Sequence, residues 1–422
     1  LAAGKGTRMK SSVPKVLHKL AGRSMLRHVI DATNTVGESK KVIVTGHGAE
    51  QVEEKFESSD TKFVRQEDQL GTAHAVSMAI PKLCEDAVVV VLYGDVPLIR
   101  PVTLQRMLAS VNQKSMGLLT ISLDDPDGYG RIVRCADGLI ESIVEQKDAT
   151  NEQRNICEIN TGVMALTSLQ LRNWLPQISN NNAQGEYYLT DIIAIARQNG
   201  IEVNSINPES VTEVEGVNNR LQLSQLERAH QLELAKQLME SGTTLADPAR
   251  FDQRGQLSVG IDNFIDINCI FEGNVTIGSN VSIGPNCCII NSTIGNDVEI
   301  LANTIIDSSE VGDSAVIGPF ARIRPGTELA EHTKVGNFVE TKKSQVGKGS
   351  KINHLSYVGD SELGENVNIG AGTITCNYDG VEKHKTLLGD GVFVGSNSTL
   401  VAPITVGNDG FIAAGSTITT KV

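Results

Sequence analysis

The sequence contains few aromatic residues, and its cysteines follow no recognisable disulfide or metal pattern. Phe, Trp and Tyr make up 4% of the 422 residues, and the seven cysteines include no CxxC pair. An odd number of cysteines in a long chain argues against a disulfide framework, and the absence of CxxC pairs argues against a thiolate metal site. We therefore expect Cys287 and Cys288 to be packing residues.

The sequence also lacks a long apolar segment. No run approaches the ~20 apolar residues of a membrane span, and charged residues interrupt the first ten positions, so no signal peptide is recognisable. We therefore expect a soluble, cytoplasmic protein. A net charge of −13 disfavours nucleic acid and anionic lipid as partners. Any phosphate-bearing ligand must then be small and bound by local basic groups. The length predicts two or three domains of ~150 residues.

The C-terminal part has a six-residue period, which neither a helix nor an ordinary strand would keep. Apolar side chains stand at every sixth position in four successive runs. These are Ile265, Phe271, Ile277, Ile283 and Ile289; Ile294, Ile300 and Ile306; Val311, Ile317, Ile323, Leu329 and Val335; and Leu388, Val394, Leu400, Val406, Ile412 and Ile418. Three such units would close one triangular coil with one inward side chain per side, and a core this narrow explains the few aromatic residues. The pattern predicts a parallel β-solenoid.

Glycine commonly follows the periodic residue. The positions are Gly278, Gly284, Gly295, Gly312, Gly318, Gly336, Gly389, Gly395 and Gly407. We expect these glycines to form the corners, because glycine adopts positive φ without steric penalty. Residues 375–387 interrupt the period with the polar segment CNYDGVEKHKT, which predicts a projecting loop; a tolerated surface insertion is the alternative. The repeats resemble those of hexapeptide-repeat acyltransferases, and this resemblance implies a left-handed β-helix.

The N-terminal half alternates apolar, strand-like segments with helical patterns. Residues 41–44 and 87–92 predict strands, and residues 25–36 and 71–80 predict helices. This alternation favours a parallel α/β sheet. Leucines at helical spacing predict a connecting helix over residues 220–239, for which we expect packing and no chemistry.

A segment rich in glycine and basic residues, LAAGKGTRM, opens the chain. Gly4 and Gly6 allow backbone amides to face a ligand, while Lys5, Arg8 and Lys15 supply positive charge. This combination favours a triphosphate. The segment is not a Walker A loop, because no GK[ST] ends it, and a GxG alone is a weak signal.

Two further motifs follow, QLGTAHA (residues 69–75) and LYGDVPL (residues 92–98). Together with LAAGKGTRM and VPK, they resemble in order and spacing the signature of the sugar-nucleotide pyrophosphorylases. Asp95 follows the apolar run VVVVL and would lie at the carboxyl end of a buried strand, where open α/β sheets bind ligands. A carboxylate there can hold Mg²⁺ against phosphate oxygens, although a turn cap is the alternative.

Five turn-like segments in this half are rich in Asn, Gln, Glu and Tyr. They are GYGR (128–131), IVEQKDA (143–149), EINTG (158–162), NNNAQGEYYLTD (180–191) and VEGVNN (214–219). These side chains can hydrogen-bond sugar hydroxyls and an acetamido group without adding positive charge. As a set, the segments predict a sugar site.

The whole chain resembles a bacterial family of bifunctional enzymes that combine N-acetylglucosamine-1-phosphate uridyltransferase with glucosamine-1-phosphate acetyltransferase. The resemblance implies a Rossmann-like α/β nucleotidyltransferase domain over residues 1–219, a linker helix over 220–242 and a left-handed β-helix over 243–422. It also implies that UDP-N-acetylglucosamine is made from acetyl-CoA, UTP and glucosamine-1-phosphate through N-acetylglucosamine-1-phosphate. This product supplies peptidoglycan and lipopolysaccharide synthesis.

The resemblance assigns a uridyltransferase site. Arg8 and Lys15 would neutralise the phosphates of UTP, and Asp95 and Asn218 would bind Mg²⁺. The sugar phosphate would attack the α-phosphorus and expel pyrophosphate without a covalent intermediate. The implied nucleotide-binding residues are Leu1, Ala2, Ala3, Gly4, Lys15, Gln66, Gly71, Thr72, Tyr93, Gly94 and Asp95, and the sugar-phosphate residues are Gly130, Glu145, Asn160, Tyr188 and Asn218.

The resemblance places an acetyltransferase site on the solenoid, in ARIRPG, GNFVETKK and INHLSYVGD. His354 would act as general base on the 2-amino group of glucosamine-1-phosphate, so that the neutral amine attacks the thioester of acetyl-CoA. The sugar phosphate would contact Arg324, Lys342, Tyr357, Asn368 and Lys383. The acetyl-CoA residues would be Ala371, Asn377, Tyr378, Ser396 and Ala414. The resemblance also implies a homotrimer with this site between subunits.

The sequence departs from the family pattern at both ends, and two other functions remain open. An apolar strand is expected before Leu1, and a tail that helps to hold coenzyme A is expected after Val422. One alternative is a nucleotidyltransferase whose solenoid only oligomerises or regulates it. Another is a non-catalytic binding protein with eroded motifs. The cluster around His354 argues against the first, and the intact LAAGKGTRM, Lys15 and Asp95 argue against the second.

Overall fold

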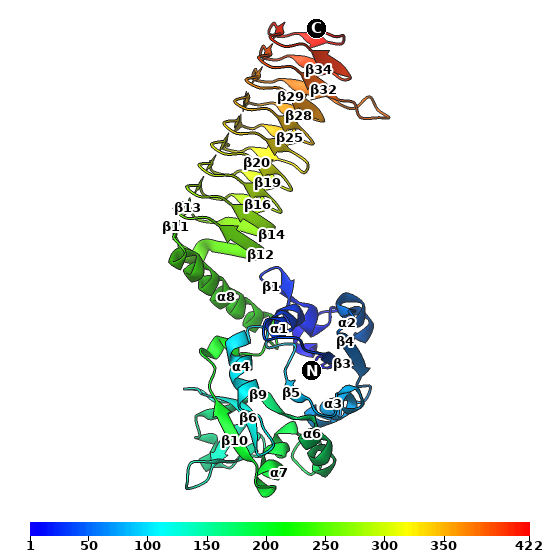
Figure 1. The fold of residues 1–422 in the computed structure, drawn as a ribbon, viewed down its shortest axis with the longest axis vertical. Coiled ribbons are helices and arrows are strands. Elements are labelled where there is room, and N and C mark those ends of the chain that lie inside the picture. Colours follow the sequence, from blue (N-terminus) through cyan, green and yellow to red (C-terminus); the bar gives the residue numbers. More distant parts are fainter. The chain divides into compact units, whose positions relative to one another are not determined.

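The computed structural model describes residues 1–422, which divide into two compact units, Leu1–Glu227 and Arg228–Val422. The division falls within helix α8 (Arg220–Glu240). Figure 1 shows a mixed α/β unit and a stack of coils. None of the helices combines the length and the apolar composition that a membrane span requires.

The first unit contains a mixed sheet, so the prediction of a parallel sheet was wrong. The strand order is β10-β6-β9-β7-β8, and β5 also pairs with β9. β10 runs parallel to β6, whereas β9 is antiparallel to β5, β6 and β7. Parallel neighbours need a crossover of about a dozen residues. Only residues 135–139 separate β7 from β8, and these two strands form an antiparallel pair.

The two strands and two helices predicted in the N-terminal half are all present in this unit, in the predicted order. The predicted strands are β3 and β5, and the predicted helices are α1 and α3. The strands are β1 (Lys19–Leu20), β2 (Arg23–Ser24), β3 (Lys41–Thr45), β4 (Thr61–Arg65), β5 (Val88–Val91), β6 (Ser115–Ser122), β7 (Arg131–Arg134), β8 (Ile140–Val144), β9 (Glu158–Thr167) and β10 (Glu202–Ile206). The helices are α1 (Met25–Asn34), α2 (Ala49–Phe56), α3 (Thr72–Ala79), α4 (Pro101–Ala109), α5 (Asn151–Arg154), α6 (Ser168–Trp174) and α7 (Ile192–Gln198).

Capping boxes define the starts of two of these helices. At α5 the Thr150 side chain accepts from the backbone N–H of Gln153, whose side chain accepts from the N–H of Thr150. Thr167 and Gln170 form the same reciprocal pair at α6. Each pair satisfies backbone donors that the first helical turn leaves unpaired. At α6 this fixes the point at which β9 ends.

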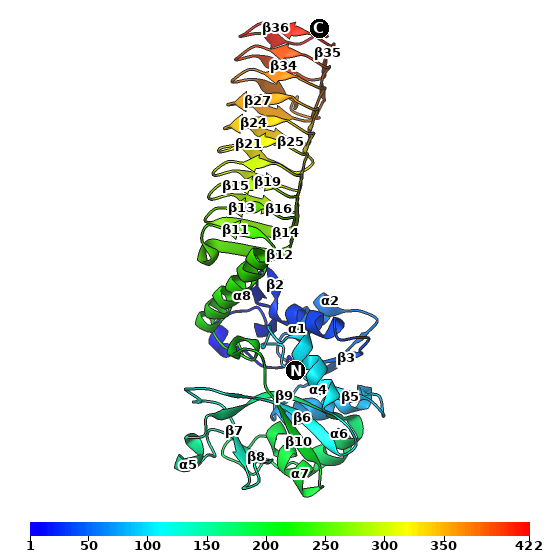
Figure 2. The same ribbon diagram turned by 60° about the vertical axis from the view of Figure 1, so that its left-hand side comes forward.

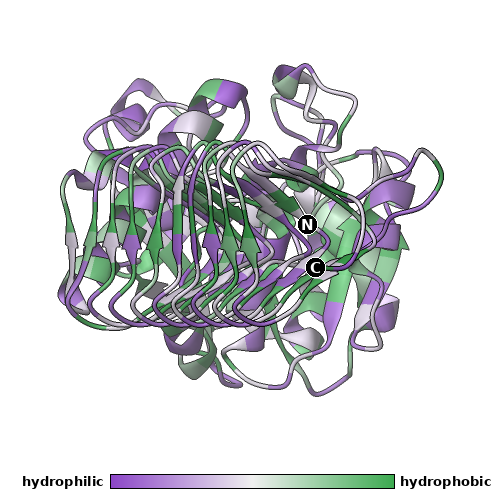
Figure 3. Ribbon diagram, turned by 90° about the horizontal axis from the view of Figure 1, so that it is seen from above, coloured by the Kyte–Doolittle hydropathy of each residue, from purple (hydrophilic) through white to green (hydrophobic).

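The second unit is a parallel β-helix with three short strands per coil. Each strand pairs in parallel and in register with its equivalent in the next coil, as in Ile283 with Ile300, Ile289 with Ile306 and Ile294 with Val311. Figures 2 and 3 show the coils stacked along one axis. The architecture is the parallel β-solenoid that the repeats predict, in the form of the left-handed β-helix that the resemblance implies.

Two sheets run the length of this stack. One consists of β11 (Thr243–Leu245), β13 (Asn263–Ile265), β15 (Ser282–Ile283), β18 (Glu299–Ile300), β21 (Val316–Ile317), β24 (Lys334–Asn337), β27 (Lys351–His354), β30 (Asn368–Ile369), β33 (Phe393–Val394) and β36 (Phe411–Ile412). The other covers the two remaining sides. It consists of β12 (Phe251–Val259), β14 (Cys269–Ile277), β16 (Cys288–Ile290), β17 (Thr293–Ile294), β19 (Ile305–Asp307), β20 (Glu310–Val311), β22 (Arg322–Ile323), β23 (Glu328–Leu329), β25 (Glu340–Lys342), β26 (Gln345–Val346), β28 (Tyr357–Gly359), β29 (Ser361–Leu363), β31 (Ile374–Cys376), β32 (Thr386–Leu388), β34 (Thr399–Val401), β35 (Ile404–Val406) and β37 (Thr417–Ile418).

The periodic residues form the core of the β-helix. All of them are buried except Ile418, which is half-buried at the last coil. The buried positions continue between Val335 and Leu388, where the sequence predicted no run. They are Thr341, Val346, Ile352, Val358, Leu363, Ile369 and Thr375. The six-residue apolar period is not visible in the sequence there, because two of the inward residues are threonines. In addition, Val346 and Leu363 each follow the preceding inward residue by five positions instead of six. The period does stop after Thr375, where residues 377–385 project beside β32 (Figure 1).

The glycines that follow the core residues do not form the corners by positive φ, so that expectation was wrong. Of the nine, only Gly318 has positive φ. The corners instead use asparagine and aspartate at many positions, such as Asn286 and Asp297. The glycines are needed because the next coil passes directly over them. A Cβ at Gly336 would lie 2.0 Å from Asn353 O, and one at Gly312 would lie 2.7 Å from Glu331 N.

Because of this close stacking, alanine substitutions at two equivalent glycines should differ in their effect on stability. Gly336→Ala should destabilise the β-helix by about 1–3 kcal/mol or more, since the backbone of the next coil must move. Gly407→Ala should have little effect, because the nearest atom to its Cβ would be Val422 O at 3.8 Å. Urea unfolding followed by circular dichroism measures both. Equal stability of the two variants would contradict this account of the glycines.

Candidate functional site

The first residues of the chain lie between strands β3 and β5. The N–H of Ala2 donates to Val44 O (2.8 Å), and the N–H of Gly94 donates to Leu1 O (2.9 Å). LAAGKGTRM therefore begins beside the carboxyl ends of both strands and next to LYGDVPL. Open α/β sheets bind their ligands at this edge.

Two basic side chains from the start of the chain meet two oxygen-bearing side chains. Lys15 Nζ forms an ion pair with Asp95 and lies 3.2 Å from Asn218 Oδ1. Arg8 donates to the same Oδ1 at 3.0 Å. Gly6 permits this arrangement because a Cβ there would lie 2.7 Å from Lys15 Cβ, and its φ of 59° suits glycine. The result is a charged cluster that joins segments more than 200 residues apart.

The oxygens of Asp95 and Asn218 could hold a divalent cation. Both contact Lys15 Nζ and therefore face the same point. Magnesium prefers oxygen ligands and is commonly held by one or two carboxylates together with substrate phosphates. No group of three His, Cys, Asp or Glu side chains is arranged as a metal site. The donor set therefore fits a cation that is shared with phosphate and does not fit a metal enclosed by protein.

QLGTAHA and NNNAQGEYYLTD are joined by backbone and side-chain hydrogen bonds. The N–H of Ala73 donates to Tyr187 O (2.9 Å), and the N–H of Leu189 donates to Thr72 Oγ1 (3.0 Å). Gly71 has φ 116°, and a Cβ there would lie 2.5 Å from Tyr187 O. Gln69 Nε2 donates to Ala3 O (2.7 Å), which connects this pair to LAAGKGTRM. The motifs predicted to bind the triphosphate and the sugar thus lie together.

The predicted sugar residues surround a partly buried carboxyl group. Glu145 accepts from Thr190 Oγ1 (3.0 Å), and burial raises the pKa of this carboxyl. The N–H of Asn160 donates to Gly130 O (2.8 Å). A Cβ at Gly130 would lie 3.5 Å from the Glu145 carboxylate oxygens. Small and polar groups around one partly desolvated carboxylate suit recognition of sugar hydroxyls.

Two aromatic residues extend this group. Tyr188 is buried, and its hydroxyl accepts from Gln184 Nε2 (2.8 Å). Burial and then the negative charges of Asp95 and Glu145 raise the pKa of Tyr93, so its hydroxyl stays neutral. A Cβ at Gly162 would lie 2.7 Å from the Tyr93 ring, which the sequence did not indicate.

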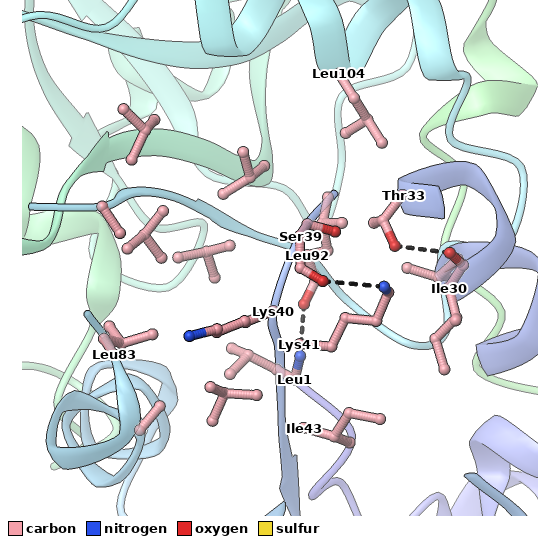
Figure 4. A pocket seen from close by; sticks show the side chains of 18 of the residues that line it. Leu1, Ile30, Thr33, Ser39, Lys40, Lys41, Ile43, Leu83, Leu92 and Leu104 are labelled. Atoms are coloured by element: carbon pink, nitrogen blue, oxygen red, sulfur yellow. Dashed lines mark hydrogen bonds between the residues drawn. The ribbon is translucent and has the colours of Figure 1, made fainter. Parts of the chain in front are cut away.

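A separate apolar cavity of about 460 Å³ lies between β3 and β5 (Figure 4). Leu1, Ile43, Leu83 and Leu104 are among the side chains that line it. The charged cluster does not contribute to this lining. Three lysines, Lys40, Lys41 and Lys82, also line it, and none of them belongs to the predicted nucleotide motifs.

On the β-helix, several predicted acetyl-site residues meet across successive coils. Arg324 donates to Glu340 (2.6 Å), and this carboxylate raises the pKa of the guanidinium. Asn377 donates to Asp360 and, at 3.4 Å, to the hydroxyl of Tyr357. Neither Glu340 nor Asp360 was predicted, although both lie within the predicted motifs. They lie 16 and 17 residues from their partners, which is close to the length of one coil.

The projecting loop brings a lysine to this group. Lys383 lies beside Lys342, and this neighbouring ammonium lowers the pKa of Lys383. Asp379 holds the loop together by accepting from the N–H groups of Val381 (2.8 Å) and Glu382 (2.7 Å) and pairing with His384 (2.7 Å). These contacts lower the pKa of Asp379. Two adjacent ammonium groups near Arg324 suit a doubly charged phosphate.

The proposed base and three acetyl-CoA residues form a line along one corner. The N–H groups of Gly372, Asn397 and Gly415 donate to His354 O (3.2 Å), Ala371 O (2.7 Å) and Ser396 O (2.8 Å). His354, Ala371, Ser396 and Ala414 thus occupy the same position in four successive coils. The His354 side chain is exposed and makes no hydrogen bond. Asn368 lies on the adjacent β30, three residues before Ala371. No side-chain hydrogen bond or ion pair joins His354 or Asn368 to Arg324, Lys342 or Tyr357.

Comparison with known proteins covers the whole chain. Residues 1–158 match the MobA-like NTP transferase domain, and residues 254–346 match the GMPPB C-terminal domain. Bifunctional protein GlmU of Marinobacter nauticus is 58% identical over all 422 residues, which cover 93% of that protein. The chain belongs to the GlmU family. Bifunctional protein GlmU of Cellvibrio japonicus is 56% identical with the same coverage. Among solved structures, an apo UDP-glucose pyrophosphorylase aligns with a TM-score of 0.46 at 18% identity, covering 55% of this chain and 97% of that one.

Both units of this GlmU family member therefore carry a cluster of polar residues. In the first unit the predicted motifs converge through hydrogen bonds of Lys15, Gln69 and Thr72. In the second, Arg324, Lys342, Tyr357, Asn377 and Lys383 form one group, and His354 forms a line with the small corner residues. The exposed ring of Tyr378 joins neither set, since its hydroxyl donates to Gly380 O within the loop (2.6 Å).

Proposed function

We propose that the protein is a bifunctional enzyme that makes UDP-N-acetylglucosamine. The β-helix unit would transfer an acetyl group from acetyl-CoA to glucosamine-1-phosphate, and the α/β unit would transfer uridylyl from UTP to the product. The observation that carries this proposal is the presence of two separate phosphate-suited clusters in a chain of the GlmU family. The product supplies peptidoglycan and lipopolysaccharide synthesis, and we place the enzyme in the cytoplasm with its co-substrates.

In the α/β unit, catalysis would be positioning and charge neutralisation. Arg8 and Lys15 would bind the phosphates of UTP, and Asp95 and Asn218 would hold Mg²⁺, which would neutralise phosphate charge when bound. Glu145 and Asn160 orient the sugar so that its phosphate oxygen faces the α-phosphorus. The new P–O bond forms as the bond to pyrophosphate breaks. No side chain needs to form a covalent bond.

In the β-helix unit, the amine of glucosamine-1-phosphate must lose a proton to attack the thioester. The exposed imidazole of His354 is free to accept it. Arg324, Lys342 and Lys383 would hold the sugar phosphate, with Tyr357 and Asn368 beside the ring. The corner formed by Ala371, Ser396 and Ala414 would hold acetyl-CoA, with Asn377 and Tyr378 nearby. Coenzyme A then leaves as the thiol.

We propose a homotrimer in which the β-helix units pack together. An exposed apolar row supports this proposal: the Phe320, Phe338 and Leu355 side chains are 49%, 58% and 64% exposed. The two rings stack with centroids 5.2 Å apart. All three residues have positive φ, which bulky side chains rarely adopt. Leu355 adjoins His354, so burial of this row against another copy would cover the acetyl site. Sedimentation equilibrium should give three times the 45.2 kDa chain mass.

The two activities can be measured separately. With acetyl-CoA and glucosamine-1-phosphate, we expect release of free thiol; with UTP, Mg²⁺ and N-acetylglucosamine-1-phosphate, we expect release of pyrophosphate. A β-helix that only oligomerises or regulates the enzyme would give pyrophosphate without thiol release. Absence of both products would contradict the proposal.

A further inference from the structure

The side-chain amide of Gln66 is held at two points, both through its nitrogen. Gln66 is 4% exposed. Its Nε2 lies 3.1 Å from Gly71 O and 3.0 Å from His74 Nδ1. A backbone carbonyl only accepts hydrogen bonds, so the atom that faces Gly71 O must be the NH₂ group. This contact fixes which end of the amide is nitrogen.

The same nitrogen determines the protonation of His74. An amide NH₂ can donate but cannot accept, and its second hydrogen points to His74 Nδ1. Nδ1 must therefore carry a lone pair, which requires the neutral imidazole with its proton on Nε2. His74 stands in the first turn of α3, three residues after Gly71. A protonated Nδ1 would instead favour the rotated amide.

With both hydrogens used, Gln66 offers a ligand only the acceptor Oε1. No donor of the protein reaches this oxygen, although the residue lines a cavity of about 400 Å³ together with Lys5, Arg65 and Gln69. This cavity adjoins the LAAGKGTRM segment, because Gln69 donates to Ala3 O. A base that enters it therefore meets a fixed acceptor beside the triphosphate segment.

We propose that His74 is a positioning residue that makes the nucleotide site select uracil over cytosine. This inference rests on the proposed uridylyl transfer. Uracil presents N3–H as a donor to Oε1, whereas cytosine presents a lone pair at N3. A freely rotating glutamine amide could serve either base by turning its NH₂ toward cytosine. The bonds of Nε2 to Gly71 O and to His74 Nδ1 together oppose that rotation, and cytosine then leaves polar groups unpaired. Removing the His74 bond leaves only one of the two restraints.

The test compares pyrophosphate release from UTP and from CTP. His74→Leu removes the acceptor, and the ratio of kcat/KM for UTP to that for CTP should fall by about 10-fold or more, mainly through KM. His74→Asn can place Oδ1 where Nδ1 was and should retain most of the ratio. His74→Ala, which suits a helix, should behave like His74→Leu and serves if leucine prevents folding.

The outcomes separate this inference from the proposed function. Failure of the unchanged protein to release pyrophosphate from UTP would contradict uridylyl transfer itself. If that protein is active but His74→Leu and His74→Ala lower UTP and CTP turnover by the same factor, His74 is only structural and the inference is wrong. An unchanged ratio in both variants would also overturn it. Loss of the ratio in His74→Asn as well would contradict the inference, because an acceptor at this position would then not hold the amide.

Discussion

Asp95→Asn is expected to lower uridylyl transfer about 10³-fold while acetyl transfer remains unchanged. The substitution keeps the shape of the side chain and removes its charge. Asp95 is the carboxylate that faces both Lys15 and Asn218, and its side chain is only 20% exposed. A cation shared with the triphosphate would lose its one anionic protein ligand. The loss corresponds to ~4 kcal/mol of transition-state stabilisation.

A matched control for this prediction is Asp86→Asn, the same chemical change at an exposed position just before β5. It should leave both activities intact. Raising the Mg²⁺ concentration should recover part of the Asp95→Asn rate, because weaker cation binding is one cause of the loss. Uridylyl transfer within ten-fold of the unchanged protein would show that Asp95 has no metal-binding or charge role. A parallel fall in thiol release would indicate a folding defect instead.

His354→Asn is expected to lower acetyl transfer about 10²–10⁴-fold, the range for loss of a general base. The imidazole is exposed and makes no hydrogen bond, so its removal should not disturb the β-helix. The effect should fall on kcat, because Arg324 and Lys342 would still bind the sugar phosphate. Uridylyl transfer should be unaffected. Free thiol and pyrophosphate, followed in separate assays, measure the two rates.

The control is His332→Asn, the same substitution at another exposed histidine of the β-helix. His332 has φ 57°, which asparagine tolerates, so the corner should keep its shape. The residual rate of His354→Asn should rise with pH as more of the substrate amine becomes neutral without help. Full thiol release by His354→Asn would show that another group, or solvent, removes the proton.

Much of the β-helix could be predicted from the sequence, because its core accepts one side chain per strand. The period failed where Thr341 and Thr375 point inward, since a threonine on its own gives no apolar signal. The sequence also could not show why glycine follows so many of the core residues. Their neighbours are atoms of the next coil, and only the stacked structure shows that a Cβ at Gly336 would meet Asn353 O.

The motifs also located most candidate residues, but their partners depend on the fold. The contacts of Arg324 with Glu340 and of Asn377 with Asp360 follow from coil length, so they could have been predicted once a coil was known to hold 17 or 18 residues. The bond between Gln66 and His74 depends on the shape of the loop at Gly71, whose positive φ no spacing indicates. The mixed sheet was not predicted, because the alternation of strands and helices suggested parallel strands. The short connection between β7 and β8 allows only an antiparallel pair.

The corner residues from His354 to Ala414 are spaced at regular intervals along the axis of the β-helix. Each coil adds about 4.8 Å, the spacing of hydrogen-bonded strands. Ala371, Ser396 and Ala414 therefore lie one, two and three coil spacings from His354, and acetyl-CoA bound along this corner would have its thioester beside the histidine. Adding or removing whole coils beyond His354 would lengthen or shorten this row of corner residues. The position of the histidine at its start would not change.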